Sequence, residues 1–236
     1  MNAYCEKAEI LVSVSPYVKI VQSILPEETH VSLLVPQGAS FHSYEPTPQA
    51  MLQATKAKIW FSLGDPFEEK VKNFLLAHNP HIKIIDLSLG LNLLEESCHT
   101  HHDHHSHDPH IWTSPKMMIE QVKKIQDVLL DVFPDKKDEI EKNCHMTILD
   151  LNHLDEEIRA TLKGCENMPV LVVHPSYGYF CREFDLVQYS IEFEGKEPSM
   201  HRLSDLVKKA QELGIKTVYG QKQYSNKSCS IIAKML

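Results

Sequence analysis

The sequence predicts an α/β protein of two parallel-sheet α/β lobes bridged by one long rigid helix. Short apolar runs alternate with segments whose apolar residues recur every three or four positions, which is typical of parallel strands connected by helices. This alternation stops near residue 135, where one helical pattern continues to about Lys163, and then resumes. At ~1.5 Å per residue this helix would be about 40 Å long, which suits a rod between two lobes.

The first lobe, residues 1–134, is expected to hold four strands and their helices. Short apolar runs predict the strands at residues 9–14, 31–35, 59–63 and 82–86. Helices are predicted over residues 16–25, from Pro48, from Pro66, and from Pro115 to Val132. Thr47 and Asp65 support two of these starts, because each is a capping residue followed by proline at the first helical position.

The connecting helix is predicted over residues 135–164, with Gly164 ending it. Its apolar residues from Ile140 to Leu162 keep a helical spacing throughout. The second lobe, residues 165–236, then repeats the α/β pattern, with strands at 170–173, 188–192 and 216–219. Helices are predicted around residues 203–213 and from Asn226, so we expect a shortened lobe that is smaller than the first.

The composition excludes several classes of protein. A formal net charge of −8 argues against a nucleic-acid-binding surface, which would be rich in Lys and Arg. No stretch approaches about 18 apolar residues, so no membrane-spanning helix is expected. Six scattered cysteines without a CxxC pair fit neither a zinc ribbon nor a disulfide-rich scaffold. The segment MNAYCEKAEI lacks the apolar core of a secretory signal, so no signal peptide is expected in this chain.

A histidine-rich segment is the most informative part of the chain. Cys98 to His110 reads CHTHHDHHSHDPH, with seven histidines in thirteen residues. Neutral imidazole is a common ligand for zinc, copper and nickel, and a dense run offers several metal sites. An affinity tag would look similar, although this run is internal, and a pH-responsive loop is the other alternative. We predict accessory metal ligands in this loop at His99, His101, His102, His104, His105 and His107.

Three histidines, the last of that segment and two others, follow predicted strands, where parallel sheets place their ligand sites. They are His42 in GASFHSYEP, His110 in DPHIW and His174 in LVVHPSYGYF. With two in the first lobe and one in the second, a shared metal would lie in the interlobe cleft. Three imidazoles with a water or carboxylate form a common zinc site. The neighbouring side chains of Tyr44, Asp108 and Tyr177 could orient the rings.

The chain resembles a known family, the ZnuA-like solute-binding components of zinc-importing ABC transporters. The matching segments span residues 30 to 230 in the expected order: GASFHSYEPTP, the histidine-rich insert, DPHIWTSP, EKNCH, VLVVHPSYGYFCREF, IEFEGKEPS and VYGQKQYSNKS. The resemblance implies two α/β lobes and a bridging helix, with metal ligands at His42, His110 and His174. The histidine-rich loop would be an accessory segment that gathers metal.

The resemblance also implies a function and a location. The protein would be a receptor that captures Zn²⁺ and delivers it to the membrane permease of an ABC transporter, as a monomer at a periplasmic or extracytoplasmic surface. In manganese members the third ligand is usually Glu, so His174 favours zinc over Mn²⁺ or Fe²⁺. A manganese or iron receptor, or a zinc buffer or storage protein, are the alternatives.

The sequence departs from the family pattern in two ways that concern the metal. Family members usually continue past this end point to a late Asp near the metal, so the fourth ligand here would be water, Glu45 or nothing, and Glu45 could also support a ligand. Residues 221–225 read QKQYS where relatives often read EPQFS, which removes a carboxylate. A zinc enzyme is not expected, because the chain has no HExxH and His153 lies in the connecting helix.

Overall fold

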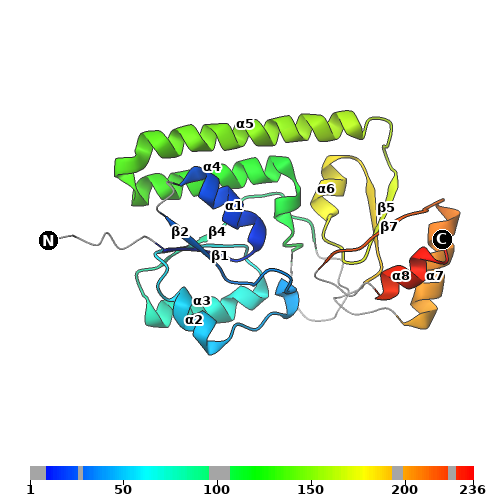
Figure 1. Cartoon of the computed structure of the whole chain (residues 1–236), viewed down its shortest axis with the longest axis horizontal. Coiled ribbons are helices and arrows are strands. Elements are labelled where there is room, and N and C mark those ends of the chain that lie inside the picture. The colour runs from blue at the N-terminus through cyan, green and yellow to red at the C-terminus, as the bar shows by residue number, and fades with distance from the viewer. Residues whose placement is uncertain (1–8, 26–28, 96–106, 193–198, 223–226) are drawn as a thin grey trace. The chain divides into compact units, whose positions relative to one another are not determined.

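A computed structural model describes residues 9–25, 29–95, 107–192, 199–222 and 227–236 (Figure 1). The chain divides into two compact units, which we call unit 1 and unit 2. Unit 1 comprises Met1–Asn92 and Pro115–Leu154, and unit 2 comprises Leu93–Ser114 and Asp155–Leu236. Each is an α/β unit with its own parallel sheet, and one long helix connects them, so the predicted fold class is confirmed.

The sheet of unit 1 has four parallel strands in the order β2-β1-β3-β4. They are β1 (Glu9–Val12), β2 (His30–Leu33), β3 (Ile59–Ser62) and β4 (Lys83–Asp86). Every predicted strand of unit 1 is present and begins within one residue of its predicted position. The central strands β1 and β3 are almost entirely buried, because helices cover both faces of a parallel sheet and such strands read as continuous apolar runs.

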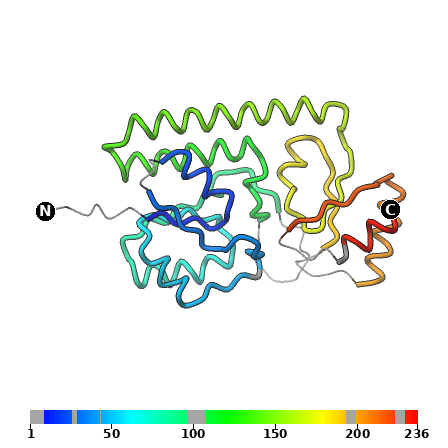
Figure 2. The backbone as a smooth tube through the Cα atoms, viewed as in Figure 1, coloured from blue at the N-terminus to red at the C-terminus, as the bar shows by residue number. Residues whose placement is uncertain are grey.

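Four helices of unit 1 connect or cover these strands, as the backbone trace in Figure 2 shows. They are α1 (Ser15–Ile24), α2 (Pro48–Ala54), α3 (Pro66–His78) and α4 (Pro115–Val132). The predicted caps are confirmed, since the Thr47 side chain accepts from the Ala50 N–H and the Asp65 side chain accepts from the Phe67 N–H. Cap and proline together fix where α2 and α3 begin.

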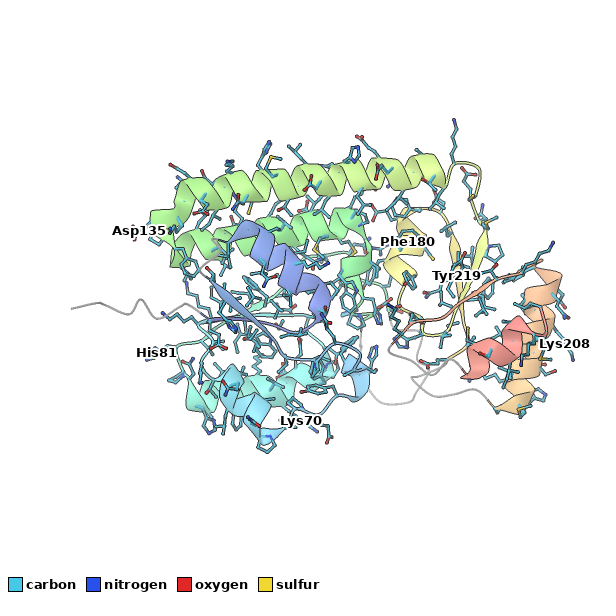
Figure 3. All side chains as sticks on the ribbon, in the orientation of Figure 1. Lys70, His81, Asp135, Phe180, Lys208 and Tyr219 are labelled. Atoms are coloured by element: carbon cyan, nitrogen blue, oxygen red, sulfur yellow. The ribbon has the colours of Figure 1, made fainter. Side chains whose placement is uncertain are left out.

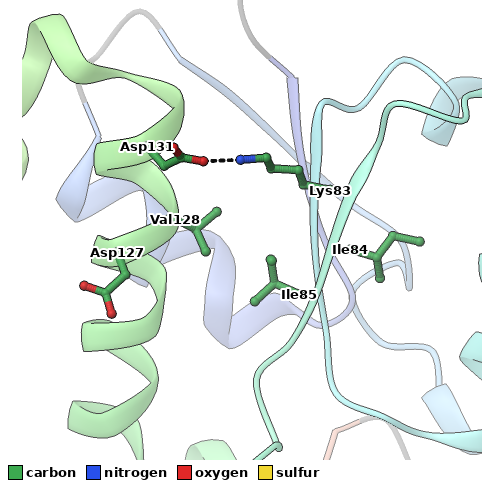
Figure 4. Close-up of a pocket in the computed structure, with 6 residues that line it drawn as sticks. All are labelled: Lys83, Ile84, Ile85, Asp127, Val128 and Asp131. Atoms are coloured by element: carbon green, nitrogen blue, oxygen red, sulfur yellow. Dashed lines mark hydrogen bonds and ion pairs between the residues drawn. The ribbon is translucent and has the colours of Figure 1, made fainter.

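Helix α4 lies along the edge strand β4 (Figure 4). Lys83 on β4 forms an ion pair with Asp131 on α4, above a shallow depression that is also lined by Ile85 and Val128. Two turns earlier on α4, the Lys124 ammonium donates to the carbonyl oxygens of Leu87 and Leu89. The Lys83–Asp131 pair is about half exposed, so it contributes little free energy, and the apolar contacts beneath it fix the helix.

A buried carboxylate closes the turn between β3 and α3. Glu68 is only 3% exposed, and its carboxylate accepts from the backbone N–H groups of Leu63 and Asp65 and from the Ser13 hydroxyl. The Ser13 oxygen in turn accepts from the Trp60 indole N–H at 3.0 Å. Burial outweighs these hydrogen bonds and raises the pKa of Glu68 to about 7.

This carboxylate is expected to make the stability of the metal-free protein depend on pH. The pKa of Glu68 is about 7 in the folded state, against 4.5 for the free side chain, so the folded state binds the proton more tightly. The protonated carboxyl group therefore contributes fully to the stability of the fold below pH 4.5, and this contribution is lost as the pH rises through 7. Between pH 4.5 and 8 the free energy of unfolding should fall by about 3 kcal/mol relative to Glu68→Gln. Denaturant unfolding of both proteins measures this. Glu69→Gln is the control, because Glu69 is the next residue and forms only an exposed ion pair with Lys72. Its free energy of unfolding should follow that of the parent protein across this pH range.

The connecting helix α5 (Lys137–Thr161) is continuous over 25 residues and follows a short 3-10 turn at Pro134–Lys136. The predicted long helix is therefore confirmed. Its first half belongs to unit 1, where Ile140, Cys144 and Thr147 are buried, and it passes into unit 2 after Leu154. Among the described residues, no helix has both the length and the apolar character needed to cross a membrane.

Unit 2 has three parallel strands in the order β6-β5-β7. They are β5 (Pro169–Val172), β6 (Val187–Ser190) and β7 (Val218–Tyr219), which accompany helices α6 (Gly178–Glu183), α7 (Met200–Glu212) and α8 (Lys227–Ala233). The sheet and α7 and α8 share one apolar core: Leu171, Val173, Ile191, Leu203, Val207, Ala210, Ile215 and Ile232. The short helix α6 has no counterpart among the predicted elements.

The compact units differ from the predicted division into residues 1–134, 135–164 and 165–236. Because residues 93–95 and 107–114 follow β4, the sequence predicts them in the first lobe, yet these described residues, including His110, belong to unit 2. The reason is hydrogen bonding to α6. The Leu94 N–H donates to the Tyr179 hydroxyl at 3.1 Å, and the Ser114 hydroxyl donates to Glu183.

Candidate metal-binding site

Two of the predicted ligands, His110 and His174, meet in unit 2. His174 lies two residues past the end of β5, His110 precedes the short 3-10 helix Ile111–Thr113, and both are 4% exposed. Their rings cross at 67° with centroids 5.1 Å apart. The two Nε2 atoms face each other at 3.3 Å.

Each ring is held at its other nitrogen by a carboxylate. The Nδ1 of His110 lies 2.6 Å from Asp108 Oδ1, and the Nδ1 of His174 lies 3.0 Å from Glu192 Oε2. Because a carboxylate accepts the proton of Nδ1, it selects the tautomer that leaves an unshared electron pair on Nε2. Asp108 was predicted to orient a ring, and it contacts His110 in this way.

Two electron pairs directed at each other repel unless a cation lies between them. In a tetrahedral zinc site with Zn–N distances of ~2.0–2.1 Å, two ligand nitrogens lie about 3.3–3.4 Å apart. The observed 3.3 Å between the Nε2 atoms matches this separation. Imidazole suits zinc and the neighbouring transition metals, whereas Mn²⁺ favours oxygen ligands. The pair is thus arranged to hold one divalent transition-metal ion.

Asp108 is held through both its carboxylate and its backbone. Its Oδ1 also accepts from the backbone N–H of His110 at 2.9 Å, while the Tyr179 hydroxyl donates to the Asp108 carbonyl oxygen. Burial raises the pKa of Tyr179 to about 12, so this hydroxyl keeps its proton at neutral pH. A Cβ atom added at Gly178 would lie 2.8 Å from Asp108 Oδ2, so the carboxylate needs a glycine at this position.

Gly178→Ala is therefore expected to weaken metal binding about 10-fold. The added methyl group would displace the carboxylate that orients His110. Helix propensity predicts the opposite sign for stability, because alanine favours a helix over glycine by about 1 kcal/mol. Zinc affinity and metal-free thermal unfolding, measured on the same variant, separate the two effects. Unchanged affinity would mean that Asp108 does not need its present position.

His42, the third predicted ligand, lies in unit 1. It belongs to the short 3-10 helix Phe41–Ser43, and its ring packs on Phe41 at 4.0 Å between centroids. Phe41 in turn packs edge-on against Phe67 in the first turn of α3 at 6.0 Å. Since α3 follows β3, these contacts place His42 near the carboxyl ends of the strands of unit 1, as predicted for a ligand.

The other predicted residues are located as follows. The Tyr44 N–H donates to the Phe41 carbonyl oxygen at the end of the same 3-10 helix, and Glu45 follows it. Tyr177 donates its backbone N–H to Gln188 and packs edge-on against Phe180, which is labelled in Figure 3. For these three residues a role at the metal stays a prediction.

Only one of the predicted loop ligands falls within the described residues. His107 is exposed and forms an antiparallel bridge with Glu95. The predicted ligands His99, His101, His102, His104 and His105 lie outside the described residues.

Two residues outside the predicted site contact His174: Glu192, which was not singled out from the sequence, and Gln221, which was noted only for the carboxylate that it lacks. Glu192 follows β6 and Gln221 follows β7, so both stand just past the end of a parallel strand. The rule that identified the histidines would have identified them too, had it been applied to every polar residue after a strand.

Solved structures share this fold. A crystal structure of ZnuA matches with a TM-score of 0.90 at 34% identity, covering 97% of this chain and 88% of that chain. A ZnuA deletion mutant with zinc bound matches with a TM-score of 0.88 at 33% identity, covering 98% of this chain and 87% of that chain. The class of the protein is therefore a two-lobed solute-binding fold with a connecting helix.

Sequence comparison identifies the family. The family described as zinc-uptake complex component A, periplasmic (ZnuA), matches residues 10–236, so the chain belongs to the ZnuA family. The high-affinity zinc uptake system protein ZnuA of Bacillus subtilis is 29% identical over 239 residues, covering 97% of this chain and 75% of the relative. Relatives from Chlamydia trachomatis and Chlamydia muridarum are 27% and 29% identical over 79% and 78% of this chain, which spans 65% and 64% of their lengths.

Proposed function

We propose that this protein is the zinc-capturing receptor of an ABC metal importer. It binds Zn²⁺ through His110 and His174, with His42 as the third imidazole, and delivers the ion to a membrane permease on the extracytoplasmic side. The histidine-rich loop raises the local zinc concentration through weaker sites. Membership of the ZnuA family supports the receptor role.

The observation that carries this proposal is the pair of facing Nε2 atoms in unit 2. Their separation of 3.3 Å suits two ligands of one zinc ion, and a carboxylate sets the tautomer of each ring. A storage protein needs only many weak sites, whereas this pair is buried, pre-oriented and formed by residues far apart in the chain. Such an arrangement is suited to tight binding of a single ion.

The choice of zinc over manganese or iron rests on the donor atoms. Neutral nitrogen ligands favour zinc, while a manganese receptor is expected to offer more carboxylate oxygens directly to the metal. In unit 2 the carboxylates of Asp108 and Glu192 contact the far nitrogens of the rings, so their role is orientation. Titration with Mn²⁺ and Fe²⁺ beside Zn²⁺ tests this, and equal affinities would favour the alternative receptor.

Calorimetric titration of four forms tests the proposal. They are the full chain, a form lacking residues 98–106, and that shortened form with His42→Ala or His174→Ala. The deletion leaves His107 and Asp108 in place, because Asp108 orients His110. We expect the shortened form to keep one tight zinc site, and both substitutions to remove it.

Two outcomes would contradict the proposal. If tight binding disappears with residues 98–106, the loop holds the zinc and the protein is a buffer. If His42→Ala retains the affinity of the shortened form, His42 is not a ligand and the third position belongs to another group.

A further inference from the structure

Gln221 makes an unusual set of contacts at the end of the short strand β7. Its side chain is buried, at 8% exposure, and it contacts the segment that follows β5. Its Oε1 accepts from the His174 N–H at 2.8 Å, and its Nε2 donates to the His174 carbonyl oxygen at 3.1 Å. The second Nε2 proton goes to the Ser176 hydroxyl oxygen at 2.6 Å. One amide thus binds both backbone polar groups of a single residue.

These contacts continue the parallel ladder with a side chain. Backbone pairing of β5 with β7 joins Leu171 to Val218 and Val172 to Tyr219. The Val173 N–H then donates to the carbonyl oxygen of Tyr219, which is labelled in Figure 3. At His174 the side-chain amide of Gln221 replaces the backbone of β7 as the partner. It offers one acceptor and one donor, as a peptide group of a neighbouring strand would.

His174 is consequently held at both ends. Glu192, after β6, fixes the ring through Nδ1, and Gln221, after β7, fixes the backbone through both its N–H and its carbonyl oxygen. The strand order β6-β5-β7 places these two residues on opposite sides of His174. With ring and backbone both fixed, the direction of Nε2 is determined.

We propose that Gln221 is a positioning residue of the metal site, which sets zinc affinity and coordination geometry by clamping the backbone of His174. The inference rests on the proposed function, because it gives His174 the role of a ligand. The amide supplies two donated hydrogen bonds that a carboxylate cannot supply. An ionised Glu at this position keeps one acceptor but turns a negative oxygen toward the His174 carbonyl oxygen.

The substitutions Gln221→Met and Gln221→Glu test this clamp in the full chain. Gln221→Met removes all three hydrogen bonds, and Gln221→Glu removes the two donated ones while adding a negative charge near a cation site. We expect each to weaken zinc binding about 10- to 100-fold, measured by competition with a chromophoric chelator. We also expect each to change the visible absorption of bound Co²⁺, which reports the geometry of its ligands.

Gln188→Met is the control, since it also removes a hydrogen bond that a side-chain amide oxygen accepts from a backbone N–H of unit 2, here the exposed N–H of Tyr177. It should keep zinc affinity within about threefold and leave the Co²⁺ spectrum unchanged. Thermal unfolding without metal checks each variant for folding. If Gln221→Met does not unfold cooperatively, Gln221→Glu, which retains size and one acceptor, decides the test.

The outcomes separate this inference from the proposed function. Parental affinity and spectrum in Gln221→Met, while His174→Ala loses zinc, would overturn the clamp alone. Tighter binding in Gln221→Glu would also overturn it, because charge would then matter more than the donated hydrogen bonds. Parental affinity in His174→Ala would overturn the proposed function and the inference together.

Discussion

The single substitutions His110→Ala and His174→Ala should each weaken zinc binding by about 100- to 1000-fold. Apparent zinc-binding free energies of ~10–16 kcal/mol, divided among the four ligands of a tetrahedral site, correspond to about 2.5–4 kcal/mol for each. Because the two Nε2 atoms are 3.3 Å apart and would share one ion, the double substitution should cost less than the sum of the single ones.

Competition titrations in zinc buffers measure these affinities on the full chain, at free zinc concentrations too low to fill weak loop sites. His201→Ala is a suitable control, because His201 lies on α7 of unit 2 with a 90% exposed side chain. It should bind zinc as the parent does. Strictly additive losses for His110 and His174 would mean that the two rings serve different ions.

The carboxylates behind the rings carry the second large expected effect. Asp108→Asn and Glu192→Gln should each reduce zinc affinity about 10- to 100-fold, because the neutral amide no longer selects the tautomer that exposes the Nε2 electron pair. Affinity should fall without a large loss of metal-free stability, since each amide is close in size to the carboxylate it replaces.

Asp205→Asn provides a control of the same chemistry at the surface. Asp205 contacts His201 Nδ1 at 3.0 Å, the distance found for Glu192 and His174, but both members of the Asp205–His201 pair are exposed. It should leave zinc affinity unchanged. Equal affinities for Asp205→Asn and Glu192→Gln would show that the buried carboxylate does not support the ligand.

The elements of this fold could be predicted because their signals are local. A strand such as β3 (Ile59–Ser62) is a short apolar run, and a helix such as α3 begins where Asp65 caps and Pro66 follows. The length of α5 also follows from spacing within one segment. Each of these features depends on neighbours only a few positions away.

The contacts that join the supporting residues to the histidines could not be predicted in this way, because they depend on strand order. His174 contacts Glu192 and Gln221, which are 18 and 47 positions away, only because β5 lies between β6 and β7. The assignment of His110 to unit 2 likewise depends on the contact of Asp108 with Tyr179, 71 positions away. Residue patterns identified the strands but contain no information about which strands are neighbours.

The hydrogen bond from the Asp108 N–H to the Leu94 carbonyl oxygen, together with the Glu95–His107 bridge, closes the base of the histidine-rich loop. The entropy cost of closing a loop grows slowly with its length, by about 0.6 kcal/mol for each doubling. Insertions or deletions between Glu95 and His107 should therefore change the folding free energy little, and they leave the spacing of Asp108 and His110 unaffected. Under the proposed function, the number of loop histidines and the geometry of the buried His110–His174 pair can thus change independently within one chain.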